Sequence, residues 1–115
     1  MHVSVVGNPD DTVVVAVRGD LDVDSAAVLT TTLDQVLDRP RPRVVVDLSA
    51  IDFCDSTGLS AFLVGGRRAT EGGGWLRLAG PNEFLERLLT TVGLARRVPV
   101  YPTVADALAD RTVGG

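Results

Sequence analysis

Residues 44–59 constrain the fold more than any other part of the chain. They read Val-Val-Val-Asp-Leu-Ser-Ala-Ile-Asp-Phe-Cys-Asp-Ser-Thr-Gly-Leu. The apolar, β-branched start, Val44–Leu48, is typical of a buried parallel strand. A short acidic loop is expected to follow, and a helix is expected to begin at Ser56. This order predicts that one serine hydroxyl lies at a sheet edge, beside the carboxylate of Asp55.

The rest of the chain continues to alternate strands and helices. Valine-rich segments 3–6 and 12–18 flank the turn sequence Asn8-Pro9-Asp10-Asp11, which predicts an N-terminal hairpin. Further strands are expected at 75–79 and 98–101. Apolar residues at helical spacing predict four helices, one from a cap near Asp24 or Ser25 to Leu37, and others at 56–71, 81–92 and 103–110.

This element order predicts a single α/β domain with a mixed, mostly parallel sheet that starts with a hairpin. The domain is expected to span residues 1–111, followed by a flexible tail at 112–115. In the third helix we expect Pro81 at the first helical position and Gly93 in a left-handed conformation after the end. Its predicted buried residues are Phe84, Leu85, Leu88, Leu89 and Val92.

Composition excludes several classes of function. All eleven basic residues are arginine, and the formal net charge is −4 with no basic stripe, so nucleic acid is not an expected partner. The absence of lysine excludes a Walker-type phosphate loop and Schiff-base chemistry. One histidine, His2, and one cysteine, Cys54, exclude a Cys/His zinc site within the chain.

The sequence also predicts where the protein works. No apolar run approaches the ~20 residues of a membrane-spanning helix. The N-terminus lacks the basic start and long apolar region of a signal peptide. A single cysteine agrees with a reducing compartment. We therefore expect a cytoplasmic protein with no membrane partner. The oligomeric state is left open.

Ser56 supports several interpretations from its position alone. It could be a nucleophile, a phosphate ligand, a phosphorylation site or only a helix cap. A hydrolase is disfavoured because the serine lies in Asp-Ser-Thr-Gly rather than Gly-x-Ser-x-Gly. Asp55 could cap the helix, contact a partner or orient Ser56. Gly58 permits close packing, and Arg67 and Glu71 fit an exposed ion pair at i, i+4.

Four landmarks together resemble the STAS domains, and among them the bacterial anti-sigma factor antagonists. They are Asp55-Ser56-Thr57-Gly58-Leu59 after Val45-Val46-Asp47-Leu48, the turn Gly19-Asp20-Leu21-Asp22, the segment Trp75–Pro81, and the helix end Val92-Gly93-Leu94. The resemblance covers about residues 12–108. It implies a protein without catalytic activity or cofactor, which binds an anti-sigma factor with serine kinase activity and so releases a sigma factor.

The resemblance also implies how that binding is controlled. The partner kinase phosphorylates the serine after the motif aspartate, which is Ser56 here, and a serine phosphatase reverses the reaction. Thr57 is the second candidate acceptor. The resemblance together with the charges predicts a partner-binding surface made by Asp20, Asp22, Asp24, Asp55, Ser56, Thr57, Gly58 and Leu59.

Two alternatives remain from the sequence. A STAS domain can also serve as a scaffold of a stress-signalling assembly or as a module of a transport system. More remotely, Asp47, Asp52 and Asp55 could form a Mg²⁺ site for phosphoryl transfer. That reading is disfavoured because receiver-like sites also need a lysine, and the Asp-x-Asp spacing of phosphatases is absent. No metal site is therefore expected.

Overall fold

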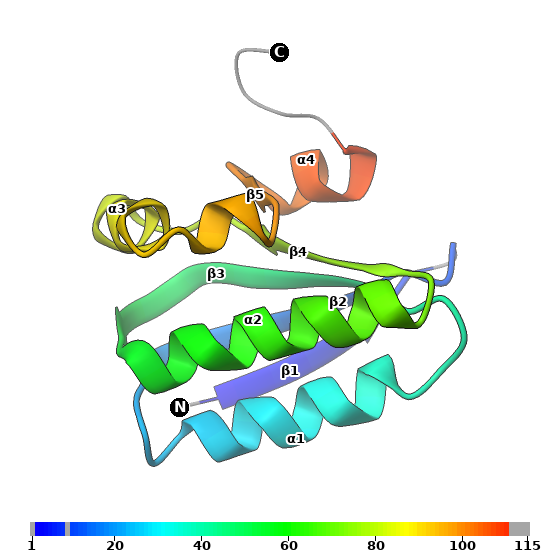
Figure 1. The fold of residues 1–115 in the computed structure, drawn as a ribbon, viewed down its shortest axis with the longest axis horizontal. Coiled ribbons are helices and arrows are strands. Elements are labelled where there is room, and N and C mark those ends of the chain that lie inside the picture. The colour runs from blue at the N-terminus through cyan, green and yellow to red at the C-terminus, as the bar shows by residue number, and fades with distance from the viewer. Residues whose placement is uncertain (1, 9, 111–115) are drawn as a thin grey trace.

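A five-stranded sheet organises the computed structural model, which describes residues 2–8 and 10–110 (Figure 1). The first two strands pair antiparallel and the remaining neighbours pair parallel, as the hairpin and the strand–helix repeats predict. The predicted tail, 112–115, lies outside the described residues. The strands lie in the sheet in chain order: β1 (His2–Gly7), β2 (Val13–Leu21), β3 (Arg43–Cys54), β4 (Trp75–Ala79) and β5 (Val100–Tyr101).

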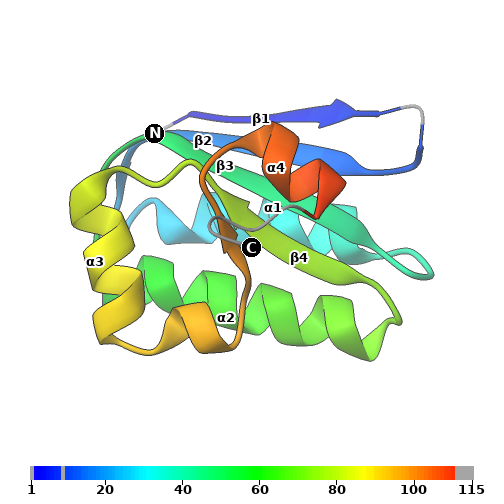
Figure 2. The same cartoon turned by 90° about the horizontal axis from the view of Figure 1, so that it is seen from above.

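Helices cover both faces of this sheet. One face carries α1 and α2 side by side, and α4 lies on the opposite face (Figures 1 and 2). Within the described residues no helix is both long and apolar enough to cross a membrane. The helices are α1 (Ala26–Leu37), α2 (Ser56–Glu71), α3 (Glu83–Thr91) and α4 (Val104–Ala109), with a 3₁₀ turn, η1 (Leu94–Arg96), after α3.

The central strand β3 joins the two halves of the core. Val44 and Val46 face the core under α1 and α2, whereas Val45 faces a smaller core under α4. All three are fully buried, which confirms the predicted buried parallel strand. The core under α1 and α2 also contains Leu85 of α3 and Leu94 of η1, so this larger core positions every element around Ser56.

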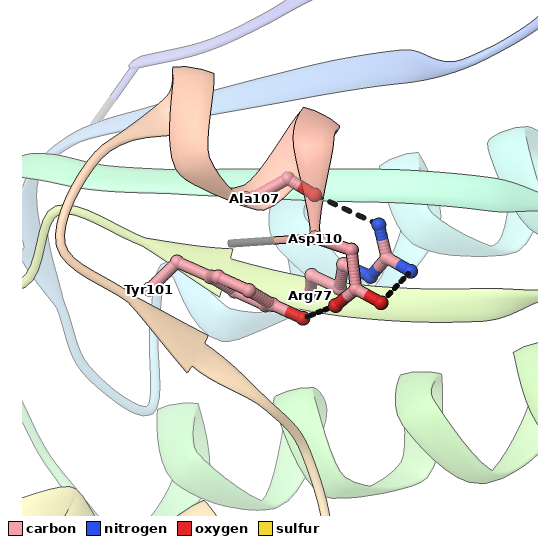
Figure 3. Close-up of polar contacts among 4 residues, drawn as sticks. All are labelled: Arg77, Tyr101, Ala107 and Asp110. Atoms are coloured by element: carbon pink, nitrogen blue, oxygen red, sulfur yellow. Dashed lines mark hydrogen bonds and ion pairs between the residues drawn. The ribbon is translucent and has the colours of Figure 1, made fainter. Parts of the chain in front are cut away.

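Arg77 of β4 holds α4 on its face of the sheet (Figure 3). Its Nη1 donates to the carbonyl of Ala107 at 2.8 Å, and its Nη2 lies 3.8 Å from Asp110 Oδ2. The guanidinium carbon lies 3.7 Å from the centroid of the Trp75 ring. The hydroxyl of Tyr101 donates to Asp110, and burial raises the pKa of Tyr101, so it remains a donor at neutral pH. This cluster joins residues of β4, β5 and the end of α4, and the sequence pattern does not predict it.

β3 is longer than predicted, and this changes the approach to Ser56. The predicted acidic loop after residue 48 is wrong, because residues 49–54 continue β3 and pair with the end of β2. Two register shifts interrupt this pairing, one of them beside Gly19, whose φ is +97°. Such bulges disturb the alternation of side chains. β2 is also longer than the predicted strand 12–18, since it continues through Leu21, and Asp20 therefore lies in this strand rather than in the predicted turn.

The third helix also differs from its prediction. Asn82 is the N-cap, and its side chain accepts from the backbone N–H of Leu85 at 2.8 Å. Pro81 therefore precedes the cap and is not the first helical residue. Phe84 and Val92 were expected in the core but are 58% and 53% exposed. Only one face of α3 packs against the core, and Leu85 and Leu89 fill that face. The remaining apolar residues of the segment are therefore left partly or largely exposed. Gly93 has the predicted left-handed conformation, with φ +79°.

Candidate functional site

Ser56 is the first residue of α2, as predicted, and its side chain is exposed. The cap belongs to Asp55, whose Oδ1 accepts from the N–H of Thr57 at 3.0 Å and of Gly58 at 3.1 Å. The interpretation of Ser56 as the helix cap is therefore wrong. Among the described residues its hydroxyl has no hydrogen-bond partner. It is a free hydroxyl at the positive end of a 16-residue helix.

Gly58 seats this end of α2 directly on the sheet. A Cβ at this position would lie 2.6 Å from Cγ of Leu21 and 2.9 Å from Sγ of Cys54. The first turn of α2 therefore touches the last residues of β2 and β3 without an intervening side chain. Leu59, the next residue, is only 8% exposed and belongs to the core. Leu59 therefore packs the start of α2 against the core and offers little surface to a partner.

The turn after β2 lies beside the start of α2. The N–H of Asp55 donates to the carbonyl of Leu21 at 3.1 Å, which joins the two segments. In that turn Asp22 Oδ1 accepts from the N–H of Asp24 at 3.1 Å and from Ser25, through its N–H at 3.0 Å and its hydroxyl at 2.9 Å. These hydrogen bonds, those from Ser25 first, lower the pKa of Asp22. The carboxylate of Asp22 is thus both ionised and fixed.

An acidic edge results at this end of the sheet, which we define as Asp20, Asp22, Asp24, Asp52 and Asp55. Ser56 and Thr57 are exposed next to it. The structure thus brings the predicted site residues together at this end of the sheet, but two of the eight, Gly58 and Leu59, are buried and offer little surface to a partner. In the described residues no group of three or more side chains is arranged to hold a metal ion.

Two exposed apolar residues belong to this edge and were missed from the sequence. Phe53, at the end of β3, is 47% exposed, and Val23, in the turn after β2, is 65% exposed. Phe53 was missed because its segment was expected to be a loop. The register shift between the partners of Ile51 and Phe53 interrupts the alternation, so Ile51 and Cys54 are buried while Phe53 faces solvent. Aromatic residues are enriched at protein interfaces relative to the rest of the surface.

The neighbouring thiol does not contribute reactive chemistry. Cys54 is buried, and burial together with the charge of Asp55 raises its pKa to about 11. A thiol with this pKa is almost entirely protonated at neutral pH and is a poor nucleophile. Its contact with the first turn of α2 confirms the prediction of a small buried residue.

Comparison with known proteins agrees with this geometry. Residues 4–102 match the family model described as "Mlab, STAS domain". An anti-sigma F factor antagonist from Paenibacillus polymyxa is 27% identical over 101 residues, 87% of this chain and 86% of that protein. The crystal structure of an anti-sigma factor antagonist from Mycobacterium paratuberculosis has a TM-score of 0.83 at 27% identity, and the match covers 95% of this chain and 93% of that one.

The phosphorylated form of the Bacillus cell fate determinant SpoIIAA shares the fold, with a TM-score of 0.72 at 17% identity over 95% of this chain and 98% of that one. The family model covers the hairpin, the acidic edge and α2 in one continuous match. The chain therefore belongs to the STAS domain family, and its relatives include proteins named anti-sigma factor antagonists.

Proposed function

We propose that this chain is an anti-sigma factor antagonist controlled by phosphorylation of Ser56. In its unmodified form it binds an anti-sigma factor that is also a serine kinase, and so frees a sigma factor in the cytoplasm. Phosphorylation by that kinase ends the complex, and a serine phosphatase restores it. The observation that carries the proposal is the exposed, unbonded hydroxyl of Ser56 beside a helix cap made by another residue, Asp55.

The separation of cap from acceptor allows a switch that leaves the fold intact. Since Asp55 satisfies the first turn of α2, modification of Ser56 removes no hydrogen bond that the helix needs. The side chain is exposed at the end of the sheet, where a kinase active site has access. SpoIIAA, a protein with this fold, exists in a phosphorylated form.

Added charge would act mainly on the partner. A phosphoserine carries about −1.5 to −2 charges at neutral pH. Two N–H groups of the first turn already bind Asp55, so the phosphate would remain at the surface beside a carboxylate. A partner surface matched to the unmodified acidic edge then meets excess negative charge and bulk. A loss of ~3 kcal/mol would weaken binding more than roughly a hundredfold.

In this proposal the chain supplies the phosphate acceptor and catalyses nothing. ATP binds to the partner kinase. The only cysteine, Cys54, has a raised pKa and is a poor nucleophile. Asp55 serves as the helix cap through Oδ1. Thr57 is a second exposed hydroxyl and is tested separately below.

A capture experiment from native cell extract tests the switch. The baits are wild type, Ser56→Ala, Ser56→Asp and the control Gln35→Glu, which adds one negative charge on the exposed side of α1. We expect wild type, Ser56→Ala and Gln35→Glu to retain a protein with sigma-binding and kinase domains, and Ser56→Asp to lose it. Equal capture by all four baits would contradict the switch. Capture of a permease or of a large scaffold particle would contradict the antagonist function.

The captured kinase then identifies the acceptor. Incubation with ATP and mass spectrometry should show one phosphate on wild type and on Thr57→Ala, and none on Ser56→Ala. A phosphate retained on Ser56→Ala but lost on Thr57→Ala would move the acceptor to Thr57.

A further inference from the structure

A groove begins at Ser56 and runs along the side of α2 that faces α3 and η1. Its volume is about 650 Å³. One wall is a stripe of α2, in which Ser56, Ser60, Leu63 and Arg67 follow one another at helical spacing. Arg96 and Arg97, at the end of η1, form the opposite wall. The two ends of the stripe, Ser56 and Arg67, are eleven positions apart, which corresponds to roughly 16 Å along the helix axis. That length accommodates about five residues of an extended peptide.

The walls of this arginine groove, which we define by Arg67, Arg96 and Arg97, carry uncompensated positive charge. Among the described residues, three arginines have carboxylate partners: Arg68 with Asp34, Arg77 with Asp110 and Arg87 with Glu83. Four described arginines outside the groove form no ion pair either, but none of them lines it: Arg18, Arg39, Arg41 and Arg43. Within residues 2–8 and 10–110, the three groove arginines form no ion pair.

The predicted ion pair between Arg67 and Glu71 does not form within the described residues, although both residues lie on α2. Glu71 lines a smaller adjoining hollow together with Arg67 and Arg97. Glu71 is the one acidic residue that lines this smaller hollow. None of the residues lining the main groove is acidic. Three positive charges therefore gather along one groove of a chain whose net charge is −4.

The floor of the groove is apolar. Leu63 is half-buried there, while Leu59 and Leu94 are nearly fully buried and line the groove from the core side. Val92 is 53% exposed at its rim. A segment that fits has apolar side chains for the floor and carboxylates for the walls. Arginine suits this task because its planar guanidinium forms paired hydrogen bonds with carboxylates.

We propose that the arginine groove binds an acidic, partly apolar segment of the anti-sigma factor. This proposal rests on the proposed function and extends it to the chemistry of the partner. An acidic segment is repelled by the rest of this negatively charged chain and attracted here. Since Ser56 lines the same groove, its phosphate would add negative charge at the groove mouth and oppose the segment directly. One modification then acts on both the acidic edge and the arginine groove.

A titration of the ¹⁵N-labelled full chain tests the groove with defined probes. The acidic peptide acetyl-Glu-Leu-Asp-Glu-Leu-Asp-amide is compared with a version that has lysine at each acidic position. We expect the acidic peptide alone to shift the amide signals of Ser60, Leu63, Arg67, Arg96 and Arg97. The binding should weaken as salt is added, because exposed charges are screened.

Two double variants that change the net charge equally are compared, one in the groove and one, as the control, outside it. Arg96→Glu/Arg97→Glu alters the groove, whereas Arg39→Glu/Arg43→Glu alters exposed arginines at the junction of α1 and β3. We expect the first to weaken the acidic peptide at least about tenfold, or ~1.4 kcal/mol, and the second to leave it within about twofold. If the first variant is poorly folded by its amide spectrum, Arg96→Gln/Arg97→Gln replaces it.

Three results would overturn the proposal. They are no shift from the acidic peptide at millimolar concentration, equal binding of the lysine peptide, and equal or tighter binding of a thymidine oligonucleotide or inorganic phosphate. Failure of the groove is distinguishable from failure of the proposed function. If the captured anti-sigma factor still depends on Ser56 but binds Arg96→Glu/Arg97→Glu as it binds wild type, the antagonist function stands and the groove proposal falls.

Discussion

The acidic edge and the arginine groove differ in sign and in how they are built, and both adjoin Ser56. At the acidic edge, Asp22 and Asp55 are fixed by hydrogen bonds to backbone N–H groups. In the arginine groove, Arg67, Arg96 and Arg97 extend from helical turns without ion-pair partners among the described residues.

This difference indicates two different tasks. The carboxylates of Asp22 and Asp55 accept hydrogen bonds from backbone N–H groups of nearby residues, so they stabilise the fold as well as charge the surface. A mutation of either residue should therefore change both stability and partner binding. Unpaired arginines on a groove wall add little to folding, since exposed charges contribute little stability. A change at the groove should therefore appear in binding alone. Ser56 lies where one modification can affect both surfaces.

The largest effect on stability is expected at Gly58, which seats both surfaces on the sheet. In Gly58→Ala the new Cβ meets buried Leu21 and Cys54 below 3.0 Å. Overpacking costs about 1–3 kcal/mol, and the higher helix propensity of alanine returns less than about 1 kcal/mol. We expect a net loss of ~1–2 kcal/mol in urea unfolding. Gly7→Ala, with nothing within 4 Å, is the control and should change little. Equal stability of Gly58→Ala would contradict the close seating of α2.

Charge reversal at the free part of the acidic edge should act on binding alone. Asp24 and Asp52 are exposed, and their carboxylates form no hydrogen bond within the described part of the chain. In Asp24→Lys/Asp52→Lys we expect about tenfold weaker binding of the anti-sigma factor, ~1.4 kcal/mol, with an unchanged melting temperature. Surface plasmon resonance at two salt concentrations measures this effect. Unchanged affinity would remove the acidic edge from the interface.

Asp55 allows its capping and charge roles to be separated. Asp55→Ala loses the side chain that accepts from Thr57 and Gly58, and we expect ~1 kcal/mol less stability. Asp55→Asn keeps an acceptor oxygen, so its stability should lie within about 0.5 kcal/mol of wild type. Weaker partner binding by the asparagine variant would show that the charge contributes to recognition. If the two variants unfold alike, the cap assignment is wrong.

The smallest effect concerns Asp22 and acid. Its pKa in the folded chain is lowered from 3.8, mainly by hydrogen bonds from Ser25. A depressed folded-state pKa stabilises the fold above the unfolded value, and this contribution is lost as pH falls through the folded one. Wild type should therefore exceed Asp22→Asn in melting temperature at pH 6, and the difference should shrink below pH 3.8. A difference that grows in acid would contradict the assigned shift.

Much of this fold could be predicted because strong local signals agree with the tertiary structure. The helix predicted at 56–71 and the strand at 75–79 have the observed bounds, since an aspartate cap precedes α2 and three glycines follow it. The length of β3 could not be predicted, because bulges removed the alternation that marks a strand. The exposure of Phe84 depends on which face of α3 the core leaves open, and the sequence pattern does not contain that information.

The site divides in the same way. Ser56, Asp55 and Gly58 lie in one short motif, so their proximity was predictable. The arginine groove was not, because Arg67 and Arg97 are thirty positions apart and only tertiary packing brings them together. Helical spacing instead favoured an ion pair of Arg67 with Glu71, which the structure does not form.

The most direct test of the account is the affinity of the captured anti-sigma factor for two purified forms of this chain. One form is unmodified and the other carries a single phosphate on Ser56, and isothermal titration calorimetry measures both under the same conditions. The account predicts that the phosphorylated form binds at least roughly a hundredfold more weakly, a difference of ~3 kcal/mol. Equal affinity, or tighter binding of the phosphorylated form, would contradict it.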